Sequence, residues 1–369
     1  MRMGGLGLRQ AATTSAAAFL GSCQASRELS TRLLVQNKKL PTHVLVPTSP
    51  MFVESPCTPI SIPGEENALV RYRQVLASYV ADGHPNNSSG ESQRVLQKQL
   101  DDALLSTLKD TSSLRDKARL NTESSVHAAA WLRAIPKVKL GLSMAPHEFT
   151  VALKLWLGIP IISPSQSIRC SCGRVIDCFG DHLLGCGHGS LRSKHHDALR
   201  DIIYHALLVD NEGAQLEQRC GPDSNSRPGH IFHPDFADGR PGYFDVSIRN
   251  TMQPAYVAKS AISAGAAAMA GEEEKDHRHD SEVNAAGGYF YPIIVESFGL
   301  WTSSSLATLK VIASKTTAKS RISFSRAVSN LLQQLSVRLF QFNARMICTS
   351  LRFDTEFDFW DLPTLAGDG

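Results

Sequence analysis

Four cysteines and two histidines fall within nineteen residues, between Cys170 and His188, and this cluster constrains the fold more than any other feature. Cys170 and Cys172 are separated by one residue, His182 follows after nine more, and Cys186 after a further three. Thiolates together with an imidazole are ligands that suit tetrahedral zinc. The spacing therefore predicts a zinc knuckle, in which two pairs of ligands wrap the chain around one ion.

Four protein ligands fill the coordination sphere of zinc, so the predicted metal is structural and any chemistry lies elsewhere. Positions 182 and 186 stand four residues apart, so we expect both side chains on one face of a helix. Cys178 and His188 are spare donors that can substitute for a member of the set. The alternative is a group of buried cysteines without metal, which explains isolated cysteines better than a cluster of this density.

The whole sequence predicts a mixed α+β or α/β protein with a helical N-terminal half. At 369 residues the chain exceeds the usual size of one domain. Helical periodicity dominates before the knuckle, and strand-like runs alternate with helices after it. The predicted parts are an Ala-rich helical segment (1–45), a Pro-rich linker (46–65), a helical domain (66–160), the knuckle (168–190), an α/β core (191–300), C-terminal helices (301–350) and an acidic, aromatic tail (351–369).

Apolar periodicity also places the individual elements. Expected helices span 66–81, 91–108, 124–135, a segment after Ser143 that ends at Gly158, 193–208, 255–270, 303–318 and 323–348. Expected strands span 214–219, 230–234, 243–249 and 289–296. In the third strand, Asp245 and Ser247 should share one face, and Val246 and Ile248 the other. The charged run that begins at Glu272 is expected to be a solvated helix face with paired charges.

Overall charge and hydropathy exclude little. A net charge of +3 is too small to indicate nucleic-acid binding by itself. No stretch reaches the ~18 to 20 consecutive apolar residues that a membrane-spanning helix requires. The first 27 residues lack Asp and Glu and are rich in Ala, Ser, Thr and Arg, a composition typical of a mitochondrial transit peptide. A truncated reading frame is the competing interpretation of that segment.

The residues around the cysteines resemble the zinc knuckle that precedes the restriction-like endonuclease domain of non-LTR retrotransposons. The match begins with Cys-Ser-Cys-Gly at 170–173, Asp177 and Gly-Asp-His at 180–182. It continues through His196-Asp197, preceded by His195 where the family has Arg, and through Glu217, Arg227-Pro228-Gly229-His230 and Phe244-Asp245-Val246. The resemblance implies a restriction-endonuclease-like core and, for the helical region before the knuckle, a segment that follows a reverse transcriptase.

The resemblance further implies a metal-dependent hydrolase that nicks target DNA, and fourteen residues between His230 and Asp245 suit a hairpin that joins their strands. The implied catalytic residues are Glu217, His230, Asp245 and Lys275, with Asp245 and Glu217 as ligands of Mg²⁺ or Mn²⁺. Lys275 is favoured over Lys259 as the catalytic lysine. The expected DNA contacts are Arg192, Lys194, His196 and Arg200, and element RNA is a further expected partner.

His230 is the main departure, because the family has a metal-binding Asp at this position. Imidazole suits Zn, Mn or Ni better than Mg, so the exchange weakens a magnesium site. The sequence therefore leaves two functions open: an active endonuclease, or a nucleic-acid-binding relic that keeps the zinc knuckle and the fold. The family resemblance favours the nucleus as the compartment, and the acid-free N-terminus offers the mitochondrion as an alternative.

Overall fold

The computed structural model describes residues 70, 93–188, 191–220 and 225–351. The predicted segments 1–45 and 46–65, nearly all of 66–92 and the tail after Leu351 lie outside these residues. The described chain is a mixed α+β structure, as the sequence predicts, and it falls into two compact units. Residues 93–112 belong to one unit and residues 113–351 form the other, so the helices from 113 to 160 pack with the sheet.

The first unit contributes one described helix, α3 (Gln93–Thr111), which matches the helix expected at 91–108. It contains no Gly or Pro, and most of its residues favour helices. Leu100 and Ala103 are buried within it, whereas Leu104 and Leu108 are exposed. The helix therefore has an apolar side and a solvated side.

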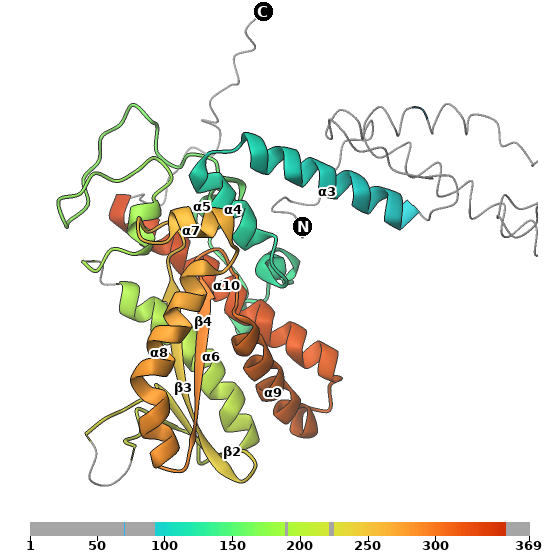
Figure 1. Ribbon diagram of the computed structural model, residues 1–369, viewed down its shortest axis with the longest axis vertical. Helices are drawn as coiled ribbons and strands as arrows, with labels where there is room; N and C mark the ends of the chain where they lie inside the picture. The colour runs from blue at the N-terminus through green and yellow to red at the C-terminus, as the bar shows by residue number, and fades with distance from the viewer. Residues whose placement is uncertain (1–69, 71–92, 189–190, 221–224, 352–369) are drawn as a thin grey trace, which may run out of the picture. The chain divides into compact units, whose positions relative to one another are not determined.

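A four-stranded sheet forms the centre of the second unit (Figure 1), with strands β1 (Gln215–Leu216), β2 (Ile231–Ala237), β3 (Arg240–Arg249) and β4 (Tyr289–Glu296) in that order. β1, β2 and β3 pair antiparallel, and β4 pairs parallel to β3. The hairpin expected between His230 and Asp245 is confirmed, with Asp238 and Gly239 turning at positive φ values of 54° and 71°. The strand expected at 214–219 has only two residues, because Glu217 leaves the extended conformation with a φ of 54°.

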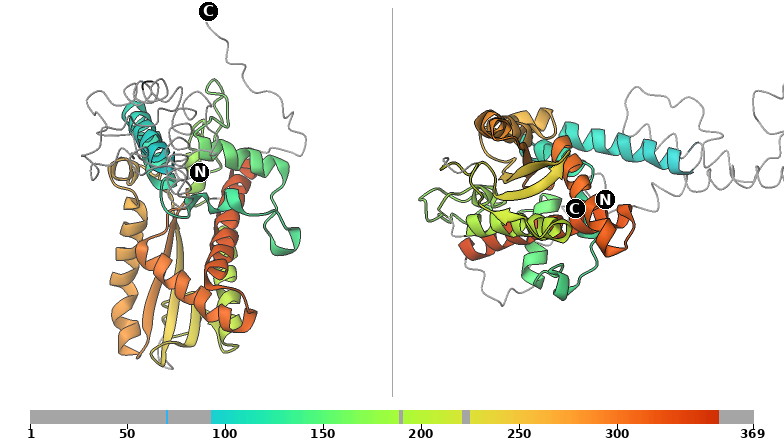
Figure 2. Two further views of the ribbon diagram at one scale, coloured as in Figure 1. Left: turned by 90° about the vertical axis from the view of Figure 1, so that its right-hand side faces the viewer. Right: turned by 90° about the horizontal axis from the view of Figure 1, so that it is seen from below.

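Helices cover both faces of the sheet, as the two views of Figure 2 show. On one face lie α6 (Leu191–Asp210), α9 (Ser303–Ser320) and α10 (Phe324–Leu351), whose apolar residues form one core with Val246, Ile293 and Val295. The other face carries α8 (Ala266–Ala285), which packs against β3 and β4. This layering leaves the two faces of β3 in different environments.

A second core lies at the end of the sheet and is built around aromatic rings. It joins α4 (Leu114–Glu123), the 3₁₀ helices η2 (Ala128–Arg133) and η4 (Asp181–Leu184), and α5 (Pro146–Leu157) to the C-terminal half of α10, whereas Val138 and Leu140 of the 3₁₀ helix η3 (Val138–Leu140) are exposed. Trp131 stacks on Phe340 with ring centroids 4.6 Å apart, and Trp156 contacts both rings edge-on. The zinc knuckle rests on this core, because Ile176, Leu183 and Leu184 belong to it.

Two of the expected helices are wrong in their limits. The helix predicted at 124–135 is a short 3₁₀ turn that follows α4, because His127 adopts a φ of 73°. The helix predicted at 255–270 is two helices, α7 (Val257–Ile262) and α8, separated where Gly265 has a φ of 85°. In contrast, α5 begins at Pro146 and ends at Gly158 in a left-handed conformation, as predicted.

Candidate metal centre and catalytic cleft

Cys170, Cys172, His182 and Cys186 come together in one group, with one ligand atom from each residue and all four atoms within 4.8 Å of one another. The sulfurs of Cys170 and Cys186 are 3.6 Å apart, and the sulfur of Cys172 is 3.2 Å from Nε2 of His182. Tetrahedral zinc with Zn–S bonds of about 2.3 Å places two sulfurs about 3.8 Å apart. The cluster is therefore a site that could hold a metal ion such as zinc, as the sequence predicts.

A tight backbone turn brings the first two ligands together. The amide of Cys170 donates to the carbonyl of Arg174, and the amide of Gly173 donates to the carbonyl of Cys170 at 2.8 Å in both cases. Gly173 has a φ of 85°, which a residue with a side chain rarely adopts. The Cys-x-Cys-Gly order therefore folds as a loop that points both thiols to one side.

The second ligand pair does not lie on one helix face, which corrects the expectation from its spacing. His182 belongs to η4, which ends at Leu184, and Cys186 follows in a loop. Gly180 and Gly185 surround this turn, and a side chain at Gly185 would approach the Gln253 amide nitrogen to 2.7 Å. Cys178 and His188, which the sequence offered as spare donors, are outside the ligand group.

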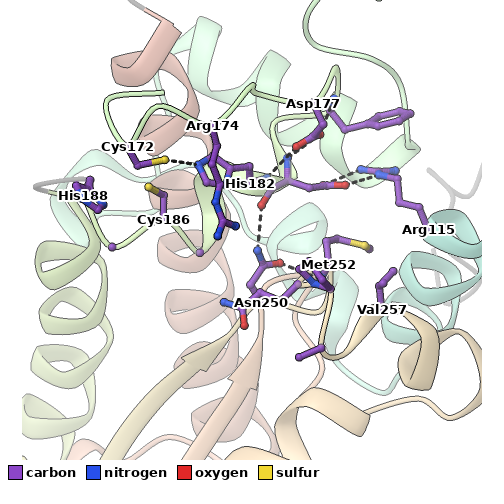
Figure 3. Close-up of a pocket in the computed structure, with 17 residues that line it drawn as sticks. Arg115, Cys172, Arg174, Asp177, His182, Cys186, His188, Asn250, Met252 and Val257 are labelled. Atoms are coloured by element: carbon purple, nitrogen blue, oxygen red, sulfur yellow. Dashed lines mark hydrogen bonds and ion pairs between the residues drawn. The ribbon is translucent and has the colours of Figure 1, made fainter. Parts of the chain in front are cut away.

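A network of hydrogen bonds holds the knuckle in place (Figure 3). The Asp177 carboxylate accepts from three backbone amides, including that of His182 at 2.9 Å. Arg115 from α4 donates to both carboxylate oxygens of Asp181, at 2.5 and 3.0 Å. Asn250, just after β3, donates to the backbone carbonyl of Asp181 at 3.0 Å. The metal site is thus fastened to the strand that carries Asp245.

The surroundings of Cys170 favour the thiolate that zinc requires. Burial alone would raise the pKa of this thiol, but hydrogen bonds from the Cys172 backbone, His182 and Cys186 outweigh burial and lower the pKa to about 6. Metal binding needs deprotonated sulfur, and the lowered pKa of Cys170 favours this state even without an ion. A hollow of about 950 Å³ lies beside the knuckle, and Asn250 and Met252 are among the residues that line it (Figure 3).

A separate cleft of about 640 Å³ lies along the open edge of β3. The ladder between β2 and β3 begins at Ile231 and Phe244, so the later residues of β3 pair only with β4. Two histidines bind the backbone amide and carbonyl of Val246, which β2 leaves unpaired. The Val246 amide donates to Nδ1 of His230 at 3.2 Å, and Nε2 of His196 contacts the Val246 carbonyl at 3.0 Å.

Asp245 is almost entirely buried and does not itself line the cleft, but it contacts two residues that do, His230 and Lys275. Its side chain is 3% exposed, and Oδ2 is 2.6 Å from Nζ of Lys275 on α8. Oδ1 is 2.7 Å from Nδ1 of His230, but that nitrogen accepts the Val246 amide. Oδ1 is thus a buried oxygen that lies against the His230 ring.

Two opposing effects set the charge of Asp245. Burial would raise the pKa of this carboxyl, but contact with His230 and the positive charge of Lys275 outweigh burial and lower it. The carboxylate is ionised at neutral pH as a result.

The predicted division of β3 side chains between two faces is confirmed for the apolar pair, since Val246 is buried in the core beneath α6 and Ile248 packs against that core.

The cleft gathers most of the residues that the sequence assigns to catalysis and DNA contact. Glu217, His230 and Lys275 line it, and Asp245 contacts the last two. Arg192, His196 and Arg200 from α6 line the opposite side, and the knuckle contributes Leu184 and Gly187. Lys194, Lys259 and Asp235 are exposed and do not line the cleft. Lys275, favoured over Lys259, is the lysine that reaches Asp245.

Two of the α6 side chains that line the cleft, Arg200 and His196, already have partners within the protein. Arg200 forms ion pairs with Asp197 at 2.9 Å and Asp201 at 2.8 Å, leaving its side chain 18% exposed. Burial lowers the pKa of His196, and the neighbouring His230 lowers it further. His196 is therefore neutral at physiological pH and acts as a hydrogen-bond donor to the β3 edge.

Sequence reasoning did not anticipate the role of Glu296. This carboxylate is fully buried at the end of β4. It accepts from the backbone amides of Ala267 and Ala268 and from the hydroxyls of Thr122 and Thr251, at 2.8 to 3.1 Å. These hydrogen bonds connect α4, the turn after β3, β4 and the N-terminus of α8. The positive end of the α8 dipole also favours an anion at this position. The location of Glu296 in a strand gave no signal of these contacts.

No protein-family model matches this chain, and no curated protein resembles it closely enough to count as a relative. Among the described residues, no helix is both long and apolar enough to cross a membrane.

Proposed function

We propose that this chain is the C-terminal part of a non-LTR retrotransposon polyprotein and that its cleft hydrolyses a phosphodiester bond of target DNA. The fold proposed for residues 191–300 is a restriction-endonuclease-like core, carried by the hairpin of β2 and β3 and the parallel strand β4. DNA is the proposed substrate, element RNA a further partner, and the nucleus the proposed compartment. The mitochondrion is the alternative compartment.

One observation carries the proposal: Asp245 is buried, ionised and paired with Lys275, which lines a polar cleft. A buried carboxylate with an altered pKa in a cleft is a common feature of functional sites. The sequence separates Asp245 from Lys275 by 29 intervening residues, so their 2.6 Å contact is a product of the fold. Lys275 can steady the negative charge that develops on a phosphate during hydrolysis.

Two carboxylates are the proposed ligands of a divalent cation. Oδ1 of Asp245 is a buried oxygen beside His230, and Glu217 lines the cleft. Carboxylate oxygens are the ligands that Mg²⁺ and Mn²⁺ prefer. Asp245 and Glu217 would hold the ion, which when bound polarises the phosphate and lowers the pKa of water. Glu217 adopts a φ of 54°, a conformation that non-glycine residues retain mainly where function or structure requires it.

The remaining cleft residues bind and orient the substrate in this proposal. Arg192 and Arg200 supply guanidinium groups for DNA phosphates, and Lys194 adds an exposed charge on the same helix. His196 keeps the free edge of β3 in place through the Val246 carbonyl. Zinc has a structural role, because four protein ligands leave it no open position, and the knuckle forms part of the cleft wall.

A second function is supported by a specific contact, the 2.7 Å approach of His230 to Asp245. Nδ1 of His230 lies beside one oxygen of Asp245, and Nζ of Lys275 lies beside the other. In the retrotransposon family, the position of His230 is occupied by a second carboxylate. A chain that binds nucleic acid without cutting it, as the relic of a former nuclease, fits this arrangement. The two functions make opposite predictions for the exchange of His230.

Nicking of supercoiled plasmid with Mg²⁺ or Mn²⁺ tests both functions. An active endonuclease converts plasmid to the open circle, and Asp245→Asn abolishes conversion while binding is retained. For a relic, the wild type is inactive and His230→Asp restores nicking. Lys259→Ala is the control, because its exposed side chain lies away from the cleft. Nicking that persists in Asp245→Asn refutes the assignment of the site.

A further inference from the structure

A third hollow, of about 530 Å³, lies behind the zinc knuckle and does not belong to the catalytic cleft. It opens between the knuckle, the start of α6 and the last turns of α10. Its apolar lining consists of Ile168, Leu183, Leu191, Met346 and Leu351. Thr349 and Ser350 are exposed at its edge, and Arg169 and His188 add polar groups. A hollow with an apolar lining and a cationic edge suits a ligand that is both aromatic and acidic.

The chain that follows has this chemistry. Residues 353–362 read Phe-Asp-Thr-Glu-Phe-Asp-Phe-Trp-Asp-Leu, with four aromatic side chains, four carboxylates and no basic residue. Arg169 lines the hollow, and three further exposed basic residues lie on the knuckle and on the first turn of α6, namely Arg174, Arg192 and Lys194. The two sets of charges are opposite in sign and equal in number, so they are complementary.

Chain length allows this segment to reach the hollow. Leu351 is the last described residue and lines the hollow itself. Phe353 is two residues further on, and an extended chain covers at most about 7 Å over that span. Phe357 lies six residues beyond Leu351, a reach of about 20 Å. The nearest aromatic rings therefore start beside the apolar lining, at a high effective concentration.

We propose that residues 353–362 dock on this hollow, with an aromatic ring among Ile168, Met346 and Leu351 and carboxylates against the basic residues around it. The occupant is a segment of the same chain. Docking brings acidic groups towards Arg192, which also lines the catalytic cleft. The tail then competes with the phosphates of nucleic acid for this surface. That consequence rests on the proposed function, whereas the docking itself does not.

Hydrogen exchange on the full chain tests the docking. In the wild type, the amides of residues 354–360 exchange ~10-fold more slowly than in Thr349→Trp, whose indole fills the edge of the hollow. Asn330→Trp is the matched control, because Asn330 is exposed on the same helix and away from the hollow, and it leaves the protection unchanged. Equal exchange in all three proteins overturns the proposal. Protection that grows with protein concentration also overturns it, because the occupant is then a second copy.

Neutralising the tail tests the competition. A variant with Asp354→Asn, Glu356→Gln, Asp358→Asn and Asp361→Asn should bind a short DNA duplex ~10-fold more tightly at low salt, measured by fluorescence anisotropy. The difference should shrink as salt screens the charges. Equal affinity of the two proteins overturns the competition. If neither protein binds DNA while the tail stays protected, the docking is supported and the DNA-binding function fails.

Discussion

Replacing His195 by phenylalanine should remove an acid-dependent loss of stability that amounts to about 2 kcal/mol between pH 7 and pH 5. His195 is buried on α6, stacks on Phe342 with ring centroids 5.5 Å apart, and its Nε2 has no hydrogen-bond partner among the described residues. Burial, with a smaller contribution from the neighbouring His196, lowers the pKa of this imidazole from 6.5 to about 3. Phenylalanine preserves the stacking and removes the proton-binding group.

The magnitude follows from linkage. Between pH 6.5 and pH 3 the unfolded chain binds a proton at His195 that the folded chain excludes, so stability falls as the pH falls. Each pH unit in this window costs about 1.4 kcal/mol, and the full shift is equivalent to about 5 kcal/mol. Because the unfolded histidine is only partly protonated near pH 6.5, the loss between pH 7 and pH 5 is about 2 kcal/mol.

Urea denaturation with excess zinc measures this effect as a difference between proteins. Other titrating groups also change the free energy of unfolding at low pH, but they do so equally in the wild type and in His195→Phe. Subtracting one protein's free energy of unfolding from the other's removes their contribution. His205→Phe is the matched control, because His205 is exposed on the same helix and its ring already contacts water in the folded protein. If wild type and His195→Phe lose stability equally between pH 7 and pH 5, the reasoning from burial is refuted.

Three further substitutions test the metal centre and the cleft. Asp177→Ala should lower zinc affinity by about 10- to 100-fold in a chelator competition, because three amides near the zinc-ligating histidine lose their acceptor; unchanged affinity would argue against this support. Lys275→Met should destabilise the fold by about 3 kcal/mol in urea denaturation, because it leaves the buried Asp245 carboxylate without its cation. Adding Asp245→Asn should recover most of that stability, and no recovery would contradict the pairing. Gly229→Ala should cost about 1–3 kcal/mol by thermal denaturation, because the new methyl group would lie 2.8 Å from the Phe244 amide nitrogen; a neutral effect would show that the hairpin adapts.

The sequence predicted the site in unequal parts. Ligand type and spacing identified the four residues that come together as a possible metal site, because few other arrangements explain so many thiols and imidazoles in one short stretch. Apolar alternation placed β3 and β4 and the direction of Val246, since strand periodicity is a local property. Helix limits failed at His127 and Gly265, where backbone conformations of positive φ interrupt a continuous apolar pattern. The prediction that His182 and Cys186 share one helix face was also wrong. A four-residue spacing places two side chains on one face only within a helix, and η4 ends at Leu184, before Cys186.

The sequence by itself determined which chemical groups this protein can use: a thiolate-rich cluster, a carboxylate in an apolar strand, and an acidic, aromatic segment at residues 353–362. Only the tertiary structure decided which groups meet. Lys275 reaches Asp245 because β4 pairs parallel to β3 and α8 crosses back over the sheet between them. His196 and His230 bind the Val246 peptide because β2 begins only at Ile231, opposite Phe244, and leaves Val246 without a partner on that side. Such contacts depend on chain segments far apart in sequence, and no local pattern encodes their distances.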